Sequence, residues 1–255
     1  MSKLPKEHKF IDLSDYGRPA ARYIAKIFKE TSVTPVQITF AFIISGLLAI
    51  AFMLTGEYYL SAFFLIFKSI LDAADGELAR IKNSPSYIGR YFDSIADIIL
   101  NFMFLLTIAY ITNTNLIYAF LAFLGIQLQG TLYNYYYVIL RNKFDGDTTS
   151  RVFENKKPIA MPGEKQQTVD GFFKVYTLLY ANFDSVIYLL DPKAVRSKPF
   201  PNWFMTVVSI FGLGFQLLII SFMLISRLEN YIIPFFIGYS IFIFLLIGIR
   251  RLISK

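Results

Sequence analysis

Long apolar stretches separated by short polar turns dominate the chain. A helix needs roughly 20 mostly apolar residues to cross a hydrocarbon core about 30 Å thick. Six stretches approach that length: 34–55, 58–80, 88–111, 115–140, 203–226 and 231–249. The pattern predicts an all-α integral membrane protein with six transmembrane helices, forming a single membrane domain over residues 1–255.

The segment before the first span, residues 14–30, has an amphipathic helical pattern. One face carries apolar and aromatic residues, and the other carries Arg18, Arg22, Lys26 and Lys29 at helical spacing. Such a helix lies in the membrane interface, with its apolar side among acyl chains and its basic side on headgroup phosphates. An amphipathic helix packed on protein is the alternative interpretation.

A polar segment, residues 141–200, separates the fourth and fifth predicted spans. Pro158, Pro162 and Gly163 mark a loop, and residues 169–190 then have a helical pattern. Charged residues within that helix, such as Asp170 and Asp184, argue against a membrane span. The segment is therefore predicted to be cytoplasmic and interfacial.

Composition and charge agree with the membrane class. Hydrophobic residues make up 55% of the chain, and the mean hydropathy is +0.51. In so apolar a chain, a net charge of +7 indicates attraction to anionic lipid and not to nucleic acid. Basic residues gather at both termini, in the turn after the second span and in the polar segment, which predicts that these regions face the cytoplasm. In a bacterium this topology places the protein in the inner membrane.

Four aspartates lie where the second and third spans meet. The residues are Asp72, Asp75, Asp93 and Asp97. At 3.6 residues per turn, each pair shares one helix face. The short turn at about 81–87 is expected to make the two helices antiparallel neighbours, so that the carboxylates can converge. Oxygen donors without sulfur or nitrogen favour Mg²⁺ or Mn²⁺, singly or as a pair.

Small residues accompany these acids on the same faces. Gly76, Ala79 and Gly89 leave room for a bulky group such as a nucleotide to approach the helix backbone. Close helix packing is the alternative reason for small residues in membranes. Together with the aspartates, the small residues favour a cavity for phosphate chemistry on the cytoplasmic side.

The stretch from Asp72 to Asp97 resembles the signature of the CDP-alcohol phosphotransferase family, D-x2-D-G-x2-A-R-x8-G-x3-D-x3-D. All eight fixed positions match. The resemblance implies an interfacial helix followed by six membrane helices, a homodimer, and two bound Mg²⁺ or Mn²⁺ ions. It also implies that Asp72, Asp75 and Asp93 bind these ions, and that Asp97 is both a ligand and the base for the acceptor hydroxyl.

The remaining signature positions are implied to bind the nucleotide. Gly76, Ala79 and Gly89 resemble the positions that accommodate cytidine and ribose. Arg80 is expected to hold the nucleotide phosphate or to pair with a carboxylate of the site.

The implied reaction belongs to phospholipid biosynthesis and releases CMP. The donor is expected to be CDP-diacylglycerol and the acceptor a small polar alcohol. Transfer from CDP-choline or CDP-ethanolamine to diacylglycerol is the alternative. A cation transporter lined by intramembrane carboxylates and a noncatalytic scaffold are the other classes that the sequence leaves open.

Three basic residues are candidates for binding the acceptor. Lys68 lies one helical turn before Asp72, where it contacts a substrate phosphate or forms an ion pair with that aspartate. Arg141 and Arg151 flank the expected cytoplasmic mouth, where they bind an acceptor phosphate or are solvated loop charges.

Overall fold

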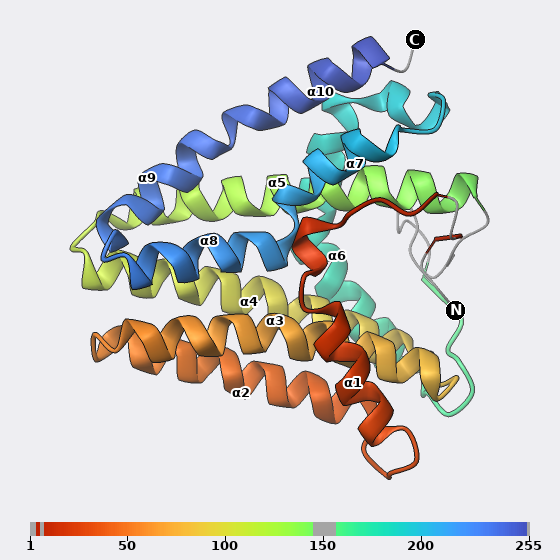
Figure 1. Ribbon diagram of the computed structural model, residues 1–255. Helices are drawn as coiled ribbons and strands as arrows, with labels where there is room; N and C mark the ends of the chain where they lie inside the picture. Colours follow the sequence, from red (N-terminus) through yellow and green to blue (C-terminus); the bar gives the residue numbers. More distant parts are fainter. Residues whose placement is uncertain (1–3, 6–7, 145–156, 254–255) are drawn as a thin grey trace.

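The computed structural model describes residues 4–5, 8–144 and 157–253, and within these the chain forms helices and no strands. The all-α prediction is therefore confirmed for this part of the chain. Four long helices follow one another in an up-and-down arrangement (Figure 1): α2 (Pro35–Leu54), α3 (Tyr58–Ile81), α4 (Tyr87–Ile111) and α5 (Leu116–Lys143). The turns between them contain Gly56, Asn83 and Asn113 in the left-handed region, which these residue types adopt most readily.

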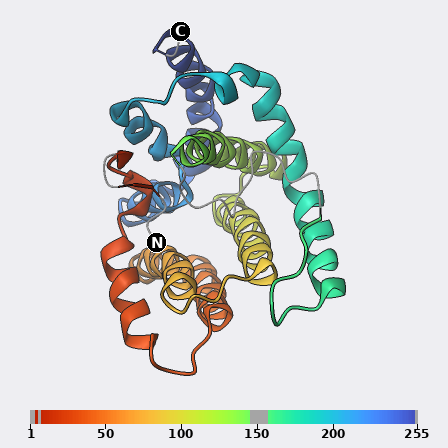
Figure 2. The same ribbon diagram turned by 90° about the vertical axis from the view of Figure 1, so that its right-hand side faces the viewer.

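Two helices run across one end of this bundle. Seen end-on in Figure 2, α1 (Arg18–Phe28) and α6 (Gln166–Leu190) lie on opposite sides of α2–α5. The helix expected over 169–190 is thus present and begins slightly earlier. The single helix expected over 14–30 is shorter than predicted, because a 3-10 turn, η2 (Leu13–Asp15), precedes α1.

Within the described residues, fewer than six helices meet the length and composition of a membrane span. Four qualify, namely α2, α4, α5 and the pair α9 (Glu229–Tyr239) with α10 (Ile241–Ile253), and a bent pair brings the number to as many as five. Helix α3 is long enough, but every 18-residue stretch of it contains Lys68, Asp72 and Asp75. Four or five apolar helices fit a multi-pass membrane protein; the six predicted spans are not confirmed.

The continuous span predicted over 203–226 is wrong. The chain forms α7 (Asn202–Val208), η4 (Ser209–Phe211) and α8 (Leu213–Ile225), with a bend of 54°. The cause is the N-terminal segment, which crosses the start of α8. Leu13 donates its N–H to the Ser209 hydroxyl (2.9 Å), and a Cβ at Gly212 or Gly214 would lie closer than 3.0 Å to atoms of Ser14. Two glycines thus permit the crossing.

We expect Gly214→Ala to destabilise the protein by about 1–3 kcal/mol, because the added methyl group meets the backbone of Ser14, which no side-chain rotation can relieve. Gly238→Ala in α9 is the matched control, since nothing lies within 4 Å of the added carbon. Thermal unfolding of both variants in detergent measures the difference. Equal unfolding temperatures would contradict the close crossing.

A buried ion pair attaches the C-terminal helix to the rest of the fold. After α6 the chain forms η3 (Pro192–Arg196), and Asp191 between them accepts hydrogen bonds from Arg250 on α10 and from the Tyr136 hydroxyl on α5. The contacts fix the polar segment 157–200 to the end of α5 and α10.

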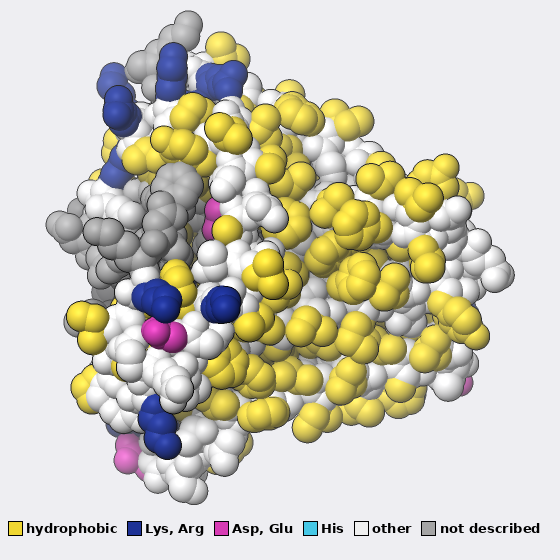
Figure 3. All heavy atoms as spheres, turned by 180° about the vertical axis from the view of Figure 1, so that it is seen from behind, with side chains coloured by type: hydrophobic (Ala, Val, Ile, Leu, Met, Phe, Trp, Pro, Cys, Tyr) yellow, Lys and Arg dark blue, Asp and Glu magenta, His cyan; other side chains and the backbone are white. Residues whose placement is uncertain are grey.

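Apolar and charged side chains separate on the surface. Large apolar side chains such as Phe63, Phe222 and Phe244 are exposed, and in Figure 3 hydrophobic side chains cover the length of the bundle on the face shown. Lys and Arg side chains gather on that face at one end. An apolar surface of this extent, with charges at its end, is typical of a membrane-embedded protein.

Candidate active site

Local sequence signals place the acidic residues on two consecutive helices. Helix α3 ends at Ile81, and Asn83 in the turn has a φ of 49°. Helix α4 begins after Ser86, whose hydroxyl accepts a hydrogen bond from the Gly89 N–H (2.8 Å). Glu164, just before α6, accepts hydrogen bonds from the Ser86 hydroxyl and the Ile88 N–H. The start of α4 is therefore held by its own cap and by the segment that leads into α6.

Three of the four predicted aspartates converge. Carboxylate oxygens of Asp72, Asp75 and Asp93 lie within 4.8 Å of one another. Asp75 is buried, and its carboxylate accepts a hydrogen bond from the Thr39 hydroxyl of α2 (2.6 Å). Oδ1 of Asp93 is buried and has no hydrogen-bond partner in the described part of the chain. Such an oxygen indicates a bound ligand, because buried polar atoms almost always have a hydrogen-bond partner.

Lys68 links the fourth aspartate to the group. Its side chain is fully buried on α3, beneath the ring of Phe42. The ammonium donates to Asp72 (3.1 Å) on the same helix and to Asp97 on α4. The geometry favours the ion-pair interpretation of Lys68 over acceptor binding, because the two carboxylates already engage a side chain that solvent does not reach.

Side chains, and not backbone packing, bring α3 and α4 together at this point. Helix α3 packs mainly on α1, α2 and α8, whereas α4 packs mainly on α2, α5 and α6. The two helices have few close backbone contacts with each other, but their carboxylates converge as expected. The space between them contains the aspartates and the ammonium of Lys68.

The small residues of the signature differ in the space around them. A Cβ at Gly76 would meet the Arg80 guanidinium at 3.6 Å, which is ordinary contact. A Cβ at Gly89 would lie 3.2 Å from the Ser86 hydroxyl. The space expected beside Gly76 is therefore covered by the flexible side chain of Arg80. An added side chain would be more crowded at Gly89 than at Gly76. Ala79 is half-buried.

A cluster of arginines around Glu77 was not apparent from the sequence. Arg18 on α1 donates to Glu77 (2.6 Å), and Arg80 and Arg22 lie 3.3 and 3.8 Å from the same carboxylate. Glu77 and Asp15 bind Arg18, which favours the alternative interpretation, packing on protein, for this residue. Burial opposes its charge, but the two carboxylates together raise the pKa of Arg18 above its ordinary value.

Of the other two acceptor candidates, Arg141 lies within the described residues. Arg141 is buried at the end of α5, with its guanidinium 5.7 Å from the ring centroid of Tyr137. The prediction for Arg151 lies outside the described residues.

Comparison with known proteins decides the family. The model of the family described as CDP-alcohol phosphatidyltransferase matches residues 32–191, well over half of the chain. The chain belongs to this family. The resemblance based on the signature is thereby confirmed, and the enzyme class of this family is CDP-alcohol phosphotransferase. The match covers α2 to α6 and excludes α1 and α7–α10.

A curated relative supports this membership in the CDP-alcohol phosphatidyltransferase family. The chain is 33% identical over 168 residues to a protein of Thermococcus kodakarensis named "Bifunctional IPC transferase and DIPP synthase". The alignment covers 65% of this chain but only 37% of the relative. The chain thus spans little more than a third of the length of the curated relative that it matches.

Proposed function

We propose that this chain transfers a substituted phosphate group from a CDP-linked alcohol to the hydroxyl of an acceptor alcohol and releases CMP, with the site at Asp72–Asp97. One observation carries the proposal. The family signature folds so that three of its aspartates meet within 4.8 Å of one another.

The residues present fit a divalent cation. Three carboxylates supply hard oxygen donors, and the buried Asp93 Oδ1 without a hydrogen-bond partner supports a ligand at this point. We propose that Asp72, Asp75 and Asp93 hold Mg²⁺ or Mn²⁺, with two ions as the family resemblance implies. When bound, such ions supply charge neutralisation at a diphosphate. The Thr39 hydroxyl orients the Asp75 carboxylate from behind.

We assign Asp97 the role of base. Its carboxylate accepts a hydrogen bond from Lys68, which fixes its position relative to Asp72. From there it takes the proton of the acceptor hydroxyl, whose oxygen forms a bond to the phosphorus while the bond to CMP breaks. Gly76, Ala79, Arg80 and Gly89 line the approach for the nucleotide, and Arg80 contributes a guanidinium beside Gly76.

CDP-diacylglycerol is the proposed donor, and a small polar alcohol the proposed acceptor. The apolar bundle supports a lipid-linked substrate, since acyl chains lie within the hydrocarbon layer while the reacting phosphate lies at its charged edge. Transfer from CDP-choline or CDP-ethanolamine to diacylglycerol is the second candidate.

We further propose a homodimer with six spans, including α3. Its active site faces the cytoplasm, and α1 and α6 lie in the membrane interface.

CMP release tests the function. Purified protein in mixed micelles is given CDP-diacylglycerol with a panel of acceptors (glycerol phosphate, inositol phosphate and serine), in Mg²⁺ or in EDTA. Release that needs the metal and increases with one acceptor supports the proposal and names the product. If CDP-diacylglycerol gives none, the panel is repeated with CDP-choline and CDP-ethanolamine plus diacylglycerol. No release with any donor would contradict the proposed function.

A further inference from the structure

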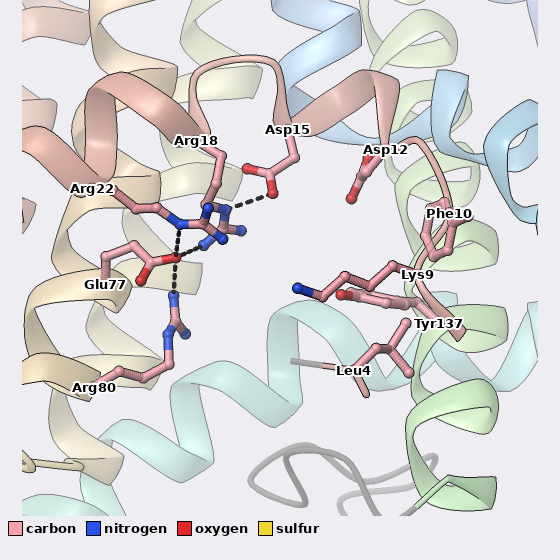
Figure 4. Close-up of a pocket in the computed structure, with 10 residues that line it drawn as sticks. All are labelled: Leu4, Lys9, Phe10, Asp12, Asp15, Arg18, Arg22, Glu77, Arg80 and Tyr137. Carbon is pink, nitrogen blue, oxygen red and sulfur yellow. Dashed lines mark hydrogen bonds and ion pairs between the residues drawn. The ribbon is translucent and has the colours of Figure 1, made fainter. Parts of the chain in front are cut away.

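We propose that a pocket between α1, α3 and α5 binds a phosphate group. The cavity measures about 440 Å³ and lies at the end of the bundle where α1 crosses. We name it the arginine pocket; its lining residues are Leu4, Lys9, Phe10, Asp12, Asp15, Arg18, Arg22, Glu77, Arg80 and Tyr137. Figure 4 shows Lys9 reaching into the cavity from one side and the three arginines gathered on the other.

The carboxylates of the pocket are already engaged. Asp12 accepts hydrogen bonds from the Ser14 N–H and hydroxyl and from the Tyr133 hydroxyl. Asp15 pairs with Arg18, and Glu77 is shared by three arginines. Three acidic side chains thus face four basic ones, so the pocket carries an excess of positive charge.

Two cations keep donors available for a ligand. Lys9 forms no ion pair within the described residues and has three N–H donors. Arg80 has its ion pair with Glu77 at 3.3 Å and offers a planar fork that matches phosphate oxygens. Across the cavity, Phe10 and Tyr137 close one wall in edge-to-face contact, with ring centroids 5.6 Å apart. An anion between Lys9 and Arg80 would meet charge from both sides.

The pocket is lined by Glu77 and Arg80 of α3, the helix that also carries Asp72 and Asp75. Arg80 borders both the pocket and Gly76, and Gly76 follows Asp75 directly in α3. Because α3 lines the pocket and carries two aspartates of the acidic cluster, we place the acceptor's phosphate in the arginine pocket and its hydroxyl at that cluster. Resting on the proposed function, this geometry narrows the acceptor to an alcohol that already carries a phosphate.

A lipid headgroup phosphate is the other source of the same chemistry. Arg22 is more than half exposed, at 56% of its side chain, and α1 has an amphipathic pattern. Lys9, Arg18 and Arg22 also precede residue 32, where the family match begins, so this side of the pocket belongs to the part of the chain outside that match.

Phosphate binding in EDTA tests the pocket apart from the aspartates and their metal. Inorganic phosphate and glycerol phosphate are titrated into the full chain in neutral detergent by calorimetry, with glycerol as the uncharged comparison. We expect both phosphates to bind and glycerol not to bind. The double variant Lys9→Gln/Arg22→Gln is expected to bind phosphate at least about tenfold more weakly, because it loses the Lys9 contact and removes two of the four positive charges that line the pocket.

A matched control removes the same charge elsewhere on α1 and just after it. Lys26→Gln/Lys29→Gln changes two exposed lysines that do not line the pocket, and it should bind phosphate as the unchanged protein does. Thermal unfolding checks that both double variants fold. Absence of phosphate binding, or equal affinity in the two double variants, would overturn the proposal.

Nanodiscs distinguish the two sources. If a lipid headgroup occupies the pocket, anionic phosphatidylglycerol lowers the affinity for glycerol phosphate relative to neutral phosphatidylcholine. If a soluble acceptor occupies the pocket, the affinity is the same in both lipids. In that case Lys9→Gln/Arg22→Gln raises KM for the acceptor and leaves kcat unaltered. Either result supports phosphate recognition. If phosphate binds but no CMP is released, the result contradicts the proposed function alone. If CMP is released normally and both double variants bind phosphate equally, the result contradicts the pocket alone.

Discussion

Asp93→Asn is expected to lower the rate of CMP release on the order of a thousandfold, since several kcal/mol of charge stabilisation depend on a complete ligand set. Asp93 carries the buried oxygen without a partner and joins α4 to the two aspartates of α3. Calorimetry with Mn²⁺ should show weaker binding in parallel. Glu30→Gln, which removes an exposed acid outside the site, is the control.

Asp97→Asn provides the contrast within the same helix. Asp97 is not part of the three-carboxylate group and binds Lys68 instead. We therefore expect it to reduce turnover strongly while Mn²⁺ affinity stays within a few fold of the unchanged protein. Loss of Mn²⁺ binding equal to that of Asp93→Asn would contradict this division and make Asp97 a metal ligand. Unchanged turnover in Asp93→Asn would contradict the whole assignment.

Lys68→Met is expected to give the second large effect, a loss of about 3–5 kcal/mol of stability. The substitution keeps the length of the side chain but leaves two mostly buried carboxylates, Asp72 and Asp97, without their shared cation. In a chain of this size, the unfolding temperature should fall on the order of 10 °C. Thermal unfolding in detergent with EDTA measures it.

The pair of carboxylates supplies the control for this prediction. Lys68→Met/Asp97→Asn removes both partners of the interhelix pair, so it should recover part of the stability lost in Lys68→Met. Mg²⁺ should also raise the unfolding temperature of Lys68→Met more than that of the unchanged protein, because Asp72 no longer pairs with an ammonium. A Lys68→Met variant as stable as the unchanged protein would contradict the role of the buried ion pairs.

Hydrophobic pattern predicted the long helices well because membrane-length apolar runs leave few alternatives. The bounds of α2, α4 and the start of α5 lie within a few residues of the expected ones. The same pattern missed the bend between α7 and α8, whose cause is Ser14, about 200 residues away in sequence. The local sequence signal of this crossing is two glycines, Gly212 and Gly214. Glycines also occur in membrane helices for other reasons, such as close helix packing.

The sequence by itself determined the chemical class of the site, because eight residues at fixed intervals identify the family and the oxygen donors available. It also determined which faces carry them, since helical periodicity is a local property. Only the tertiary structure decided how those faces meet. Asp72, Asp75 and Asp93 converge, whereas Asp97 accepts a hydrogen bond from Lys68. Glu77 of α3 binds Arg18 of α1. Both arrangements depend on distances between separate helices, which residue spacing along one chain does not encode.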